Sequence, residues 1–278
     1  MHVGLHSYSR RQAFAQPGYD VFTFLDEAAA WGFRAVEVMT GKAGGCEHIA
    51  SDDVPYLRRV AAHAVARELR LACWSTYNDF SITSAEPWRL DNIRYIQDWI
   101  VKAAATNVPN LRFLTGYIPA GEDPARLERL VEAATRACCV LAERHGVNLA
   151  LENHSAVFPY AADILRLRAA VGSPRLTTCP DPSNGFPVQQ PQADTLTRMY
   201  ANLALLAPHA SNAHLKVFGV EGQGLACFDV DRVIGILGAA GFTGSIQLEL
   251  PDASAPTDLL RRARDVVDAA IRRAGAAP

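Results

Sequence analysis

The stretch DPARLERLVEAATRACCVLAERHGVNLALE, residues 123–152, contains the pattern that decides the fold. Asp123 and Pro124 are typical of a helix start. The aspartate side chain accepts hydrogen bonds from unpaired backbone amides, and proline has no amide hydrogen that needs a partner. Apolar side chains then recur at helical spacing until Gly146, which favours the left-handed conformation that ends many helices. The short apolar run that follows predicts a buried strand, and this strand ends in the carboxylate of Glu152.

The same alternation of a short apolar run with a longer amphipathic run extends over the whole chain. The predicted strands cover residues 3–5, 35–38, 71–74, 111–114, 149–151, 176–179, 212–215 and 245–250. Alternating strands and helices indicate a parallel sheet, and eight such units are typical of a closed barrel. We therefore expect one (β/α)₈ TIM barrel, a single domain over residues 1–278, because no linker divides the chain.

Helix boundaries outside this stretch follow the same rules. Further helix starts are predicted at Asp20, Asp52 and Asp258, and further helix ends at Gly32, Gly172 and Gly241. The helix-to-strand turns are then short, whereas the strand-to-helix loops are longer and richer in polar and aromatic residues. Barrel enzymes build their sites on such loops. The long loops cover residues 39–53, 75–87, 116–123, 180–194 and 217–228.

Composition excludes several classes of protein. The 27 basic and 29 acidic residues give a formal charge of −2 without long runs of either sign, so we expect no nucleic-acid partner. No stretch of about 18 uncharged apolar residues occurs, so we expect no membrane partner. The first residues indicate a strand and not a signal peptide, which favours a cytoplasmic protein. The cysteines are scattered and are interpreted as reduced thiols: Cys46, Cys73, Cys138, Cys139, Cys179 and Cys227.

Four consecutive predicted strands end in a side chain that suits a divalent metal. These residues are Glu152, Asp181, His214 and Glu249. Their separations of 29, 33 and 35 positions each correspond to about one strand-helix unit. In a barrel the four side chains would converge on one rim from adjacent strands, so we expect them to bind one metal ion. Three carboxylates and an imidazole suit Mn²⁺ or Mg²⁺, and they leave Co²⁺ and Zn²⁺ open.

Three short motifs carry a resemblance to a known family. They are Leu-Glu-Asn-His at 151–154, His-Leu-Lys at 214–216 and Phe-Thr-Gly-Ser-Ile-Gln-Leu-Glu at 242–249. In order and spacing the chain resembles, over essentially its whole length, the xylose-isomerase-like barrels. These include sugar and sugar-phosphate isomerases and epimerases, inosose dehydratase and endonuclease IV. The resemblance implies that the four strand-end residues coordinate the metal and that Glu152 and Glu249 also transfer protons.

Further candidates for substrate binding lie on the same rim or just beyond it. They are His6, Trp74, Tyr77, His154, Asn184 and Lys216, with Tyr8, Glu37, Asn78 and Asn153 as further pocket or supporting residues. Lys216 is two positions after His214 on one strand, so both side chains should point the same way. Lys216 could then balance an enolate or hold a carboxylate or phosphate of a carbohydrate-like substrate.

The leading functional hypothesis is a metal-dependent isomerase or epimerase of a sugar, sugar acid or related polyol ketone. A metal that holds a carbonyl and the adjacent hydroxyl would ease removal of the carbon-bound proton and stabilise an enediolate. The first alternative is a lyase that removes the same proton and expels a β-hydroxyl or glycosyl group, as inosose dehydratase, dehydroshikimate dehydratase or a 3-keto-glycoside eliminase would. The second is a sugar-binding partner subunit without activity. A homodimer or homotetramer is expected by family habit.

Departures from family patterns narrow these hypotheses. Endonuclease IV needs a larger set of His and Asp ligands for three zinc ions, which this rim does not supply, so DNA repair is disfavoured. Free-ketose 3-epimerases commonly carry a His shortly after the metal Asp and an Arg after the metal His. Here Asn184 and the segment 217–219 take these places.

Overall fold

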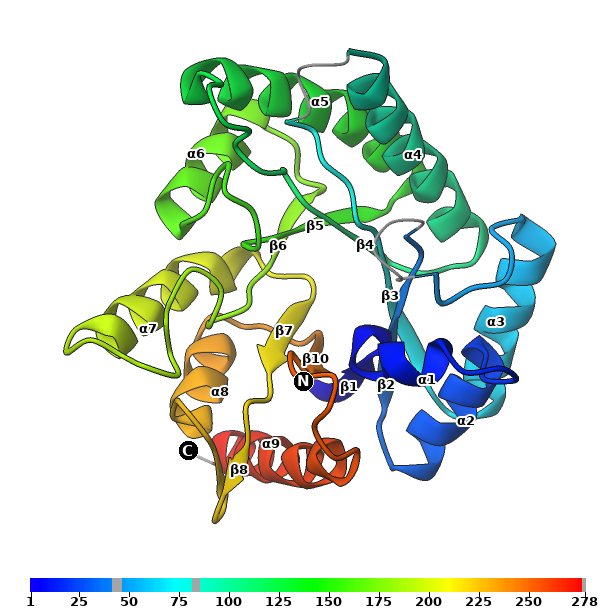
Figure 1. Ribbon diagram of the computed structural model, residues 1–278, viewed down its shortest axis with the longest axis vertical. Helices are drawn as coiled ribbons and strands as arrows, with labels where there is room; N and C mark the ends of the chain where they lie inside the picture. Colours follow the sequence, from blue (N-terminus) through cyan, green and yellow to red (C-terminus); the bar gives the residue numbers. More distant parts are fainter. Residues whose placement is uncertain (42–46, 82–85, 277–278) are drawn as a thin grey trace.

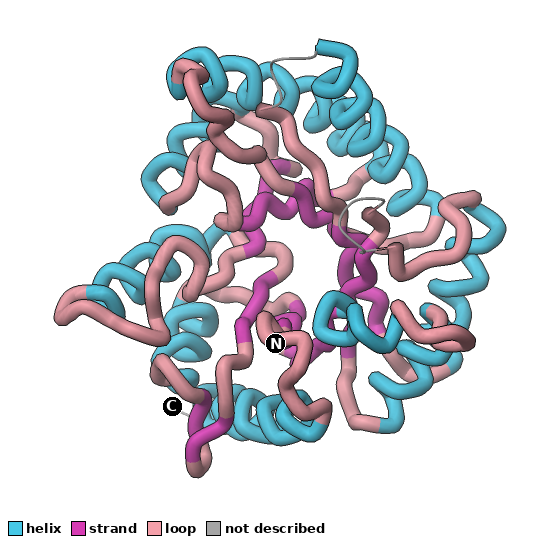
Figure 2. The backbone as a smooth tube through the Cα atoms, in the orientation of Figure 1, coloured by secondary structure: helices cyan, strands magenta, loops and turns pink. Residues whose placement is uncertain are grey.

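The computed structural model describes residues 1–41, 47–81 and 86–276. Eight parallel strands form the inner wall of the molecule, and helices surround them (Figure 2). The strands are β1 (His2–His6), β2 (Ala35–Met39), β3 (Arg70–Ser75), β4 (Asn110–Phe113), β5 (Asn148–Glu152), β6 (Leu176–Cys179), β7 (Ala213–Lys216) and β10 (Ser245–Glu249). Each overlaps one predicted strand, so the predicted (β/α)₈ barrel is confirmed.

The sheet closes at a seam between β6 and β7. Hydrogen-bonded neighbours run in the order β6-β5-β4-β3-β2-β1-β10-β7, so β6 and β7 are its two edges. At the seam Thr178 and Ala210 form an isolated parallel bridge. Two backbone hydrogen bonds lie beside it, from the Ser211 amide to the Thr178 carbonyl at 3.1 Å and from the His214 amide to the Pro180 carbonyl at 3.0 Å. Backbone pairing is therefore sparse at this edge.

Helices cover the outside of the barrel (Figure 1). The main helices are α2 (Val21–Ala30), α3 (Val54–Ala66), α4 (Glu86–Ala105), α5 (Pro124–His145), α6 (Ala161–Val171), α7 (Thr195–Leu206), α8 (Val230–Ala239) and α9 (Asp258–Ala276). Short elements in the loops are η1 (Ser7–Arg10), α1 (Arg11–Phe14), η2 (Ala207–His209) and the hairpin β8 (Val220–Glu221) with β9 (Gly224–Leu225). Within the described ranges, no helix combines the length and apolarity needed to cross a membrane.

The predicted helix boundaries are mostly confirmed. Asp20 and Asp123 cap α2 and α5 by accepting from backbone amides at 2.8 and 3.0 Å. The prediction for Asp52 is wrong. Helix α3 begins at Val54, and Asp53, the residue after Asp52, occupies the capping position. Asp258 lies inside the first turn of α9 and not before it. All four glycines predicted to end helices have φ between 70° and 79°.

Trp74 points away from the barrel interior. Its ring is fully buried, packs against Trp99 of α4, and donates from Nε1 to Thr106 Oγ1 at 3.1 Å. Side chains alternate along a strand, and the next residue, Ser75, faces His6 across the interior at 3.4 Å. The prediction that Trp74 lines a pocket is therefore wrong, because the residue belongs to the layer between strands and helices.

The cysteines that the structure describes are unpaired. Cys73, Cys138, Cys139 and Cys179 are buried, and Cys227 is half-buried. Burial raises the pKa of the Cys139 thiol to about 11, which keeps it protonated. Cys46 lies outside the described residues, as do parts of the long loops predicted over residues 39–53 and 75–87.

Candidate functional site

A polar pocket opens where the carboxyl ends of the strands meet. It is lined by His6, Tyr8, Met39, Tyr77, Arg112, Glu152, His154 and Glu249. Six of these were predicted from the sequence as site or pocket residues: His6, Tyr8, Tyr77, Glu152, His154 and Glu249. The pocket therefore lies at the end of the barrel where the long loops were expected to form a site.

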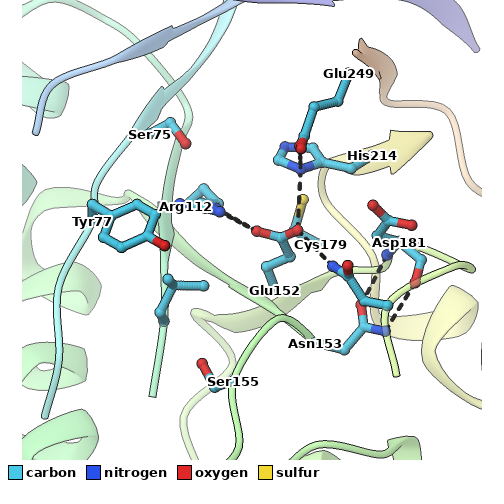
Figure 3. A network of polar contacts seen from close by, with 12 residues as sticks. Ser75, Tyr77, Arg112, Glu152, Asn153, Ser155, Cys179, Asp181, His214 and Glu249 are labelled. Carbon is cyan, nitrogen blue, oxygen red and sulfur yellow. Dashed lines mark hydrogen bonds and ion pairs between the residues drawn. The ribbon is translucent and has the colours of Figure 1, made fainter. Parts of the chain in front are cut away.

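Glu152, His214 and Glu249 converge at the base of this pocket (Figure 3). Nδ1 of His214 lies 3.4 Å from Glu152 Oε1 and 3.6 Å from Glu249 Oε2. The three ligand atoms are all within 4.8 Å of one another, and all three residues are buried. Among the described residues, Nδ1 of His214 has no hydrogen-bond partner although it is fully buried. A buried nitrogen between two carboxylates is an arrangement that a metal ion would satisfy.

Glu37 of β2 holds the other nitrogen of the same imidazole. His214 Nε2 lies 3.0 Å from both oxygens of Glu37, and Asn212 Nδ2 donates to Glu37 Oε2 at 2.6 Å. Burial opposes ionisation of Glu37, but His214 and His6 outweigh it and hold the pKa of this carboxyl well below its usual range. With an ion bound, Glu37 would accept the Nε2 proton of His214, and the Nδ1 lone pair would face the ion between Glu152 and Glu249.

Arg112 is a site residue that sequence reasoning missed. Its guanidinium lies on the pocket wall, donates from Nε to Glu152 Oε2 at 2.6 Å, and contacts the same oxygen through a second nitrogen. Burial opposes ionisation of Glu152, yet Arg112 and His214 hold its pKa well below the usual range. The available signal was a charged residue among apolar ones in the predicted strand 111–114. Such a residue must pair inside the barrel.

Asp181 does not join the three-residue cluster, although the sequence placed it there. Its Oδ2 accepts from Lys216 Nζ at 2.7 Å, and its Oδ1 accepts from the amide and hydroxyl of Ser183 at 2.9 and 2.7 Å. Burial opposes ionisation of Asp181, but Lys216 outweighs it and lowers the pKa. Lys216 also donates to Asn184 Oδ1 at 2.7 Å. Lys216 and Asn184 thus contact the candidate ligands themselves.

The other predicted substrate residues surround this group. His6 Nε2 lies 3.3 Å from Glu37 Oε1, and its Nδ1 lies 3.9 Å from Glu249 Oε2. Tyr77 is 37% exposed at the pocket mouth, and its hydroxyl lies 3.3 Å from that of Tyr117. These side chains could contact a bound ligand from above the cluster.

The charges of the site fit a divalent cation. Four buried carboxylates, those of Glu37, Glu152, Asp181 and Glu249, face two permanent cations, Arg112 and Lys216. Two positive charges against four negative ones leave a formal excess of −2 when the histidines are neutral, as a histidine that binds a metal must be. Buried charge of this kind requires compensation. A divalent ion on Glu152, His214 and Glu249 would supply it.

Comparison with families of known proteins gives a clear result. The family described as "Xylose isomerase-like TIM barrel" matches residues 25–270. The chain belongs to this family. A search of curated proteins gives no match. The resemblance that the sequence motifs indicated is therefore confirmed.

Solved structures of related barrels align with this xylose isomerase-like barrel over nearly its whole length. D-psicose 3-epimerase from Clostridium cellulolyticum H10 aligns with a TM-score of 0.73 and 14% identity, covering 99% of this chain and 98% of the other. An L-ribulose 3-epimerase aligns with a TM-score of 0.73 and 15% identity, covering 99% and 95%. The 3-keto-D-glucoside 4-epimerase YcjR from E. coli aligns with a TM-score of 0.69 and 14% identity, covering 97% and 98%. At these identities the similarity establishes the fold.

Proposed function

We propose that this xylose isomerase-like barrel is a divalent-metal-dependent isomerase or epimerase of a sugar, sugar acid or related polyol ketone. One observation carries the proposal: the unpartnered, buried Nδ1 of His214 is directed between the carboxylates of Glu152 and Glu249, beneath a polar pocket. The sugar epimerases with the same fold support it. Mn²⁺ or Mg²⁺ suits this mixture of carboxylate and imidazole ligands.

Each residue has a definite task in this proposal. Glu152, His214 and Glu249 would hold the ion, and Glu37 fixes the orientation of the His214 ring. When bound, the ion would polarise the carbonyl group of a hydroxy ketone and so acidify the neighbouring carbon-bound proton. Tyr77 and His154 line the pocket above the ligands and would orient the substrate hydroxyl groups.

The two glutamates differ in their freedom to move a proton. Glu152 Oε2 is held by Arg112, and Glu152 Oε1 accepts from Asn184 Nδ2 at 2.9 Å. The nearest described cationic or imidazole groups to Glu249 are 3.6 to 3.9 Å away, beyond hydrogen-bond distance. We therefore assign the main proton transfer to a carboxylate oxygen of Glu249. Glu152 has the secondary role in proton transfer.

Solvent isotope exchange tests the proposal directly. Protein supplied with Mn²⁺ or Mg²⁺ would be incubated in D₂O with a panel of ketoses, aldoses and keto acids of sugars, and products would be analysed by NMR and mass spectrometry. We expect deuterium to enter at the carbon next to the carbonyl without loss of other atoms. Loss of water or release of an aglycone would instead identify a lyase. If no compound exchanges, the proposed activity is wrong.

A matched pair of variants separates proton transfer from folding. Glu249→Gln should lower kcat by about 10²- to 10⁴-fold, the usual contribution of a positioned acid or base. Glu143→Gln, an exposed carboxylate at the end of α5, should leave kcat unchanged. An unchanged kcat in Glu249→Gln would remove Glu249 from the mechanism.

A further inference from the structure

We propose that Ser9 and Arg11 are positioning residues for Glu249, and that they hold this residue through its main chain. The inference rests on the proposed function, in which Glu249 binds the metal ion and carries out the main proton transfer. A carboxylate that accepts a proton needs a free oxygen atom. Its position must therefore be fixed by contacts that leave the carboxylate oxygens free.

The residues of the cluster differ in how their side chains are held. Arg112 donates to the Glu152 carboxylate, and Glu37 contacts the His214 imidazole. The nearest described cationic or imidazole groups to the Glu249 carboxylate are 3.6 to 3.9 Å away, beyond hydrogen-bond distance. The placement of Glu249 thus depends on its main chain.

The main chain of Glu249 has a strand partner on one side only. The register of β1 with β10 ends at the pair Leu5 and Leu248, and after His6 the chain turns into η1. On the other side of β10, strand β7 continues, and the Val217 amide donates to the Glu249 carbonyl at 2.8 Å. The backbone groups that face the end of β1 therefore need partners from side chains.

Ser9 supplies two of these partners. Its hydroxyl donates to the Leu248 carbonyl at 3.1 Å and accepts from the Leu250 amide at 2.9 Å. These two groups belong to the two peptide units that join Glu249 to its neighbours. The Ser9 hydroxyl therefore restrains the backbone dihedrals of Glu249, and with them the direction of its side chain.

Arg11 holds the segment that follows Glu249. Its Nη1 donates to the Leu250 carbonyl at 2.9 Å, and its Nη2 donates to the Pro251 carbonyl at 2.7 Å. The same guanidinium donates to the Tyr8 carbonyl at 3.0 Å and lies 4.2 Å from the centre of the Tyr8 ring. Because Tyr8 lines the pocket, Arg11 joins the pocket wall to the strand end that carries Glu249.

A double-mutant cycle on Mn²⁺ binding tests the assignment without any substrate. Electron paramagnetic resonance of free Mn²⁺ would give the Kd of the wild type, Ser9→Ala, Glu249→Ala and the double variant, and a second cycle would use Arg11→Met. We expect each single substitution to weaken Mn²⁺ binding by about tenfold, the lower end of the usual effect of groups that orient a metal ligand. In the Glu249→Ala background the same substitutions should change the Kd by less than about twofold, because the carboxylate that they position is gone.

Matched variants separate positioning from stability. The Ser173 hydroxyl accepts from the Arg175 amide at 3.2 Å, and Arg136 donates to two carbonyls at the end of α6. Ser173→Ala and Arg136→Met thus remove main-chain hydrogen bonds of the same kind at the other end of the barrel, and their Kd should equal that of the wild type. Ser9→Thr retains the hydroxyl and should bind Mn²⁺ within about twofold of the wild type.

The outcomes separate this inference from the proposed function. If the substitutions at Ser9 and Arg11 weaken binding equally with and without the Glu249 carboxylate, they do not act through Glu249, and the inference is wrong while the proposed function stands. An unchanged Kd in both single variants, or an equal loss in the matched variants, would also overturn it. A wild type that binds no Mn²⁺ would overturn both. If the cycles give the expected result but no compound exchanges deuterium, the proposed activity alone is wrong.

Discussion

Arg112 Nε lies 2.6 Å from Glu152 Oε2, and both side chains are buried beneath the pocket. Arg112 belongs to β4 and Glu152 ends the neighbouring strand β5. The guanidinium also donates to the Thr76 carbonyl at 2.6 Å, so it links three consecutive strand ends. This contact keeps Glu152 ionised and leaves one of its oxygens directed toward His214.

Arg112→Met should destabilise the protein by about 3 to 5 kcal/mol, because it leaves the buried Glu152 charge without its partner. Urea denaturation of both proteins measures this difference. Arg94→Met removes an arginine from an exposed pair with Asp91 and should change stability by less than about 0.5 kcal/mol. If both substitutions have equally small effects, the Arg112–Glu152 pair is not a stabilising contact.

Glu37→Gln should weaken Mn²⁺ binding by about 10- to 100-fold, the usual effect of removing a carboxylate that orients a ligating histidine. The physical reason is that Glu37 accepts the Nε2 proton of His214 and so presents Nδ1 to the ion. Calorimetric titration checks the Kd, with Glu143→Gln as the control. An unaltered Kd would show that the ring orientation does not depend on Glu37.

His48 should make stability depend on pH in a defined window. Burial lowers the pKa of His48 to about 3, and Ser7 and the stacked ring of Phe14 surround it. In the unfolded chain the pKa of this histidine is near 6.5. The unfolded chain therefore binds more protons than the native state at intermediate pH. The contribution of the neutral, buried His48 to the free energy of unfolding is complete above about pH 6.5. It declines as the pH falls toward about 3, by up to about 1.4 kcal/mol per pH unit.

Urea denaturation at a series of pH values tests this expectation. His48→Gln should flatten the slope of stability against pH between about pH 6.5 and pH 4. His145→Gln, at an exposed position, should retain the wild-type slope. Equal slopes in all three proteins would contradict the assignment to His48.

Two glycine-to-alanine substitutions should act with opposite sign. A Cβ on Gly4 would lie 2.1 Å from Gln247 Oε1 inside the barrel, so Gly4→Ala should cost about 1 to 3 kcal/mol through overpacking. A Cβ on Gly235 of α8 would have open space, so Gly235→Ala should stabilise the protein by up to about 1 kcal/mol. Thermal and urea denaturation measure both. A neutral Gly4→Ala would show that the Gln247 side chain can move aside.

Sequence periodicity was sufficient for the strand positions, because every strand is a short run with apolar or β-branched residues between longer helical runs. Side-chain partners were not predictable in the same way. Arg112 and Lys216 reach carboxylates on other strands, about 40 and 35 positions away, and only the closed barrel brings these atoms together. Trp74 was misplaced because position at a strand end does not decide which face a side chain occupies. Asp52 was misplaced by one residue because its neighbour Asp53 offers the same capping chemistry.

The Lys216–Asp181 pair adds a side-chain contact to the seam between β6 and β7. Lys216 is the last residue of β7, and Asp181 follows β6 by two positions, so their contact bridges the two edges of the sheet. Elsewhere around the ring, continuous backbone ladders join the strands, whereas here an isolated bridge and a few hydrogen bonds do so. The side-chain pair therefore links two strands that few backbone hydrogen bonds join. We expect local opening of the native protein to begin at this seam. Slow hydrogen exchange at the Ser211 and His214 amides would show that the Lys216–Asp181 pair keeps the seam closed.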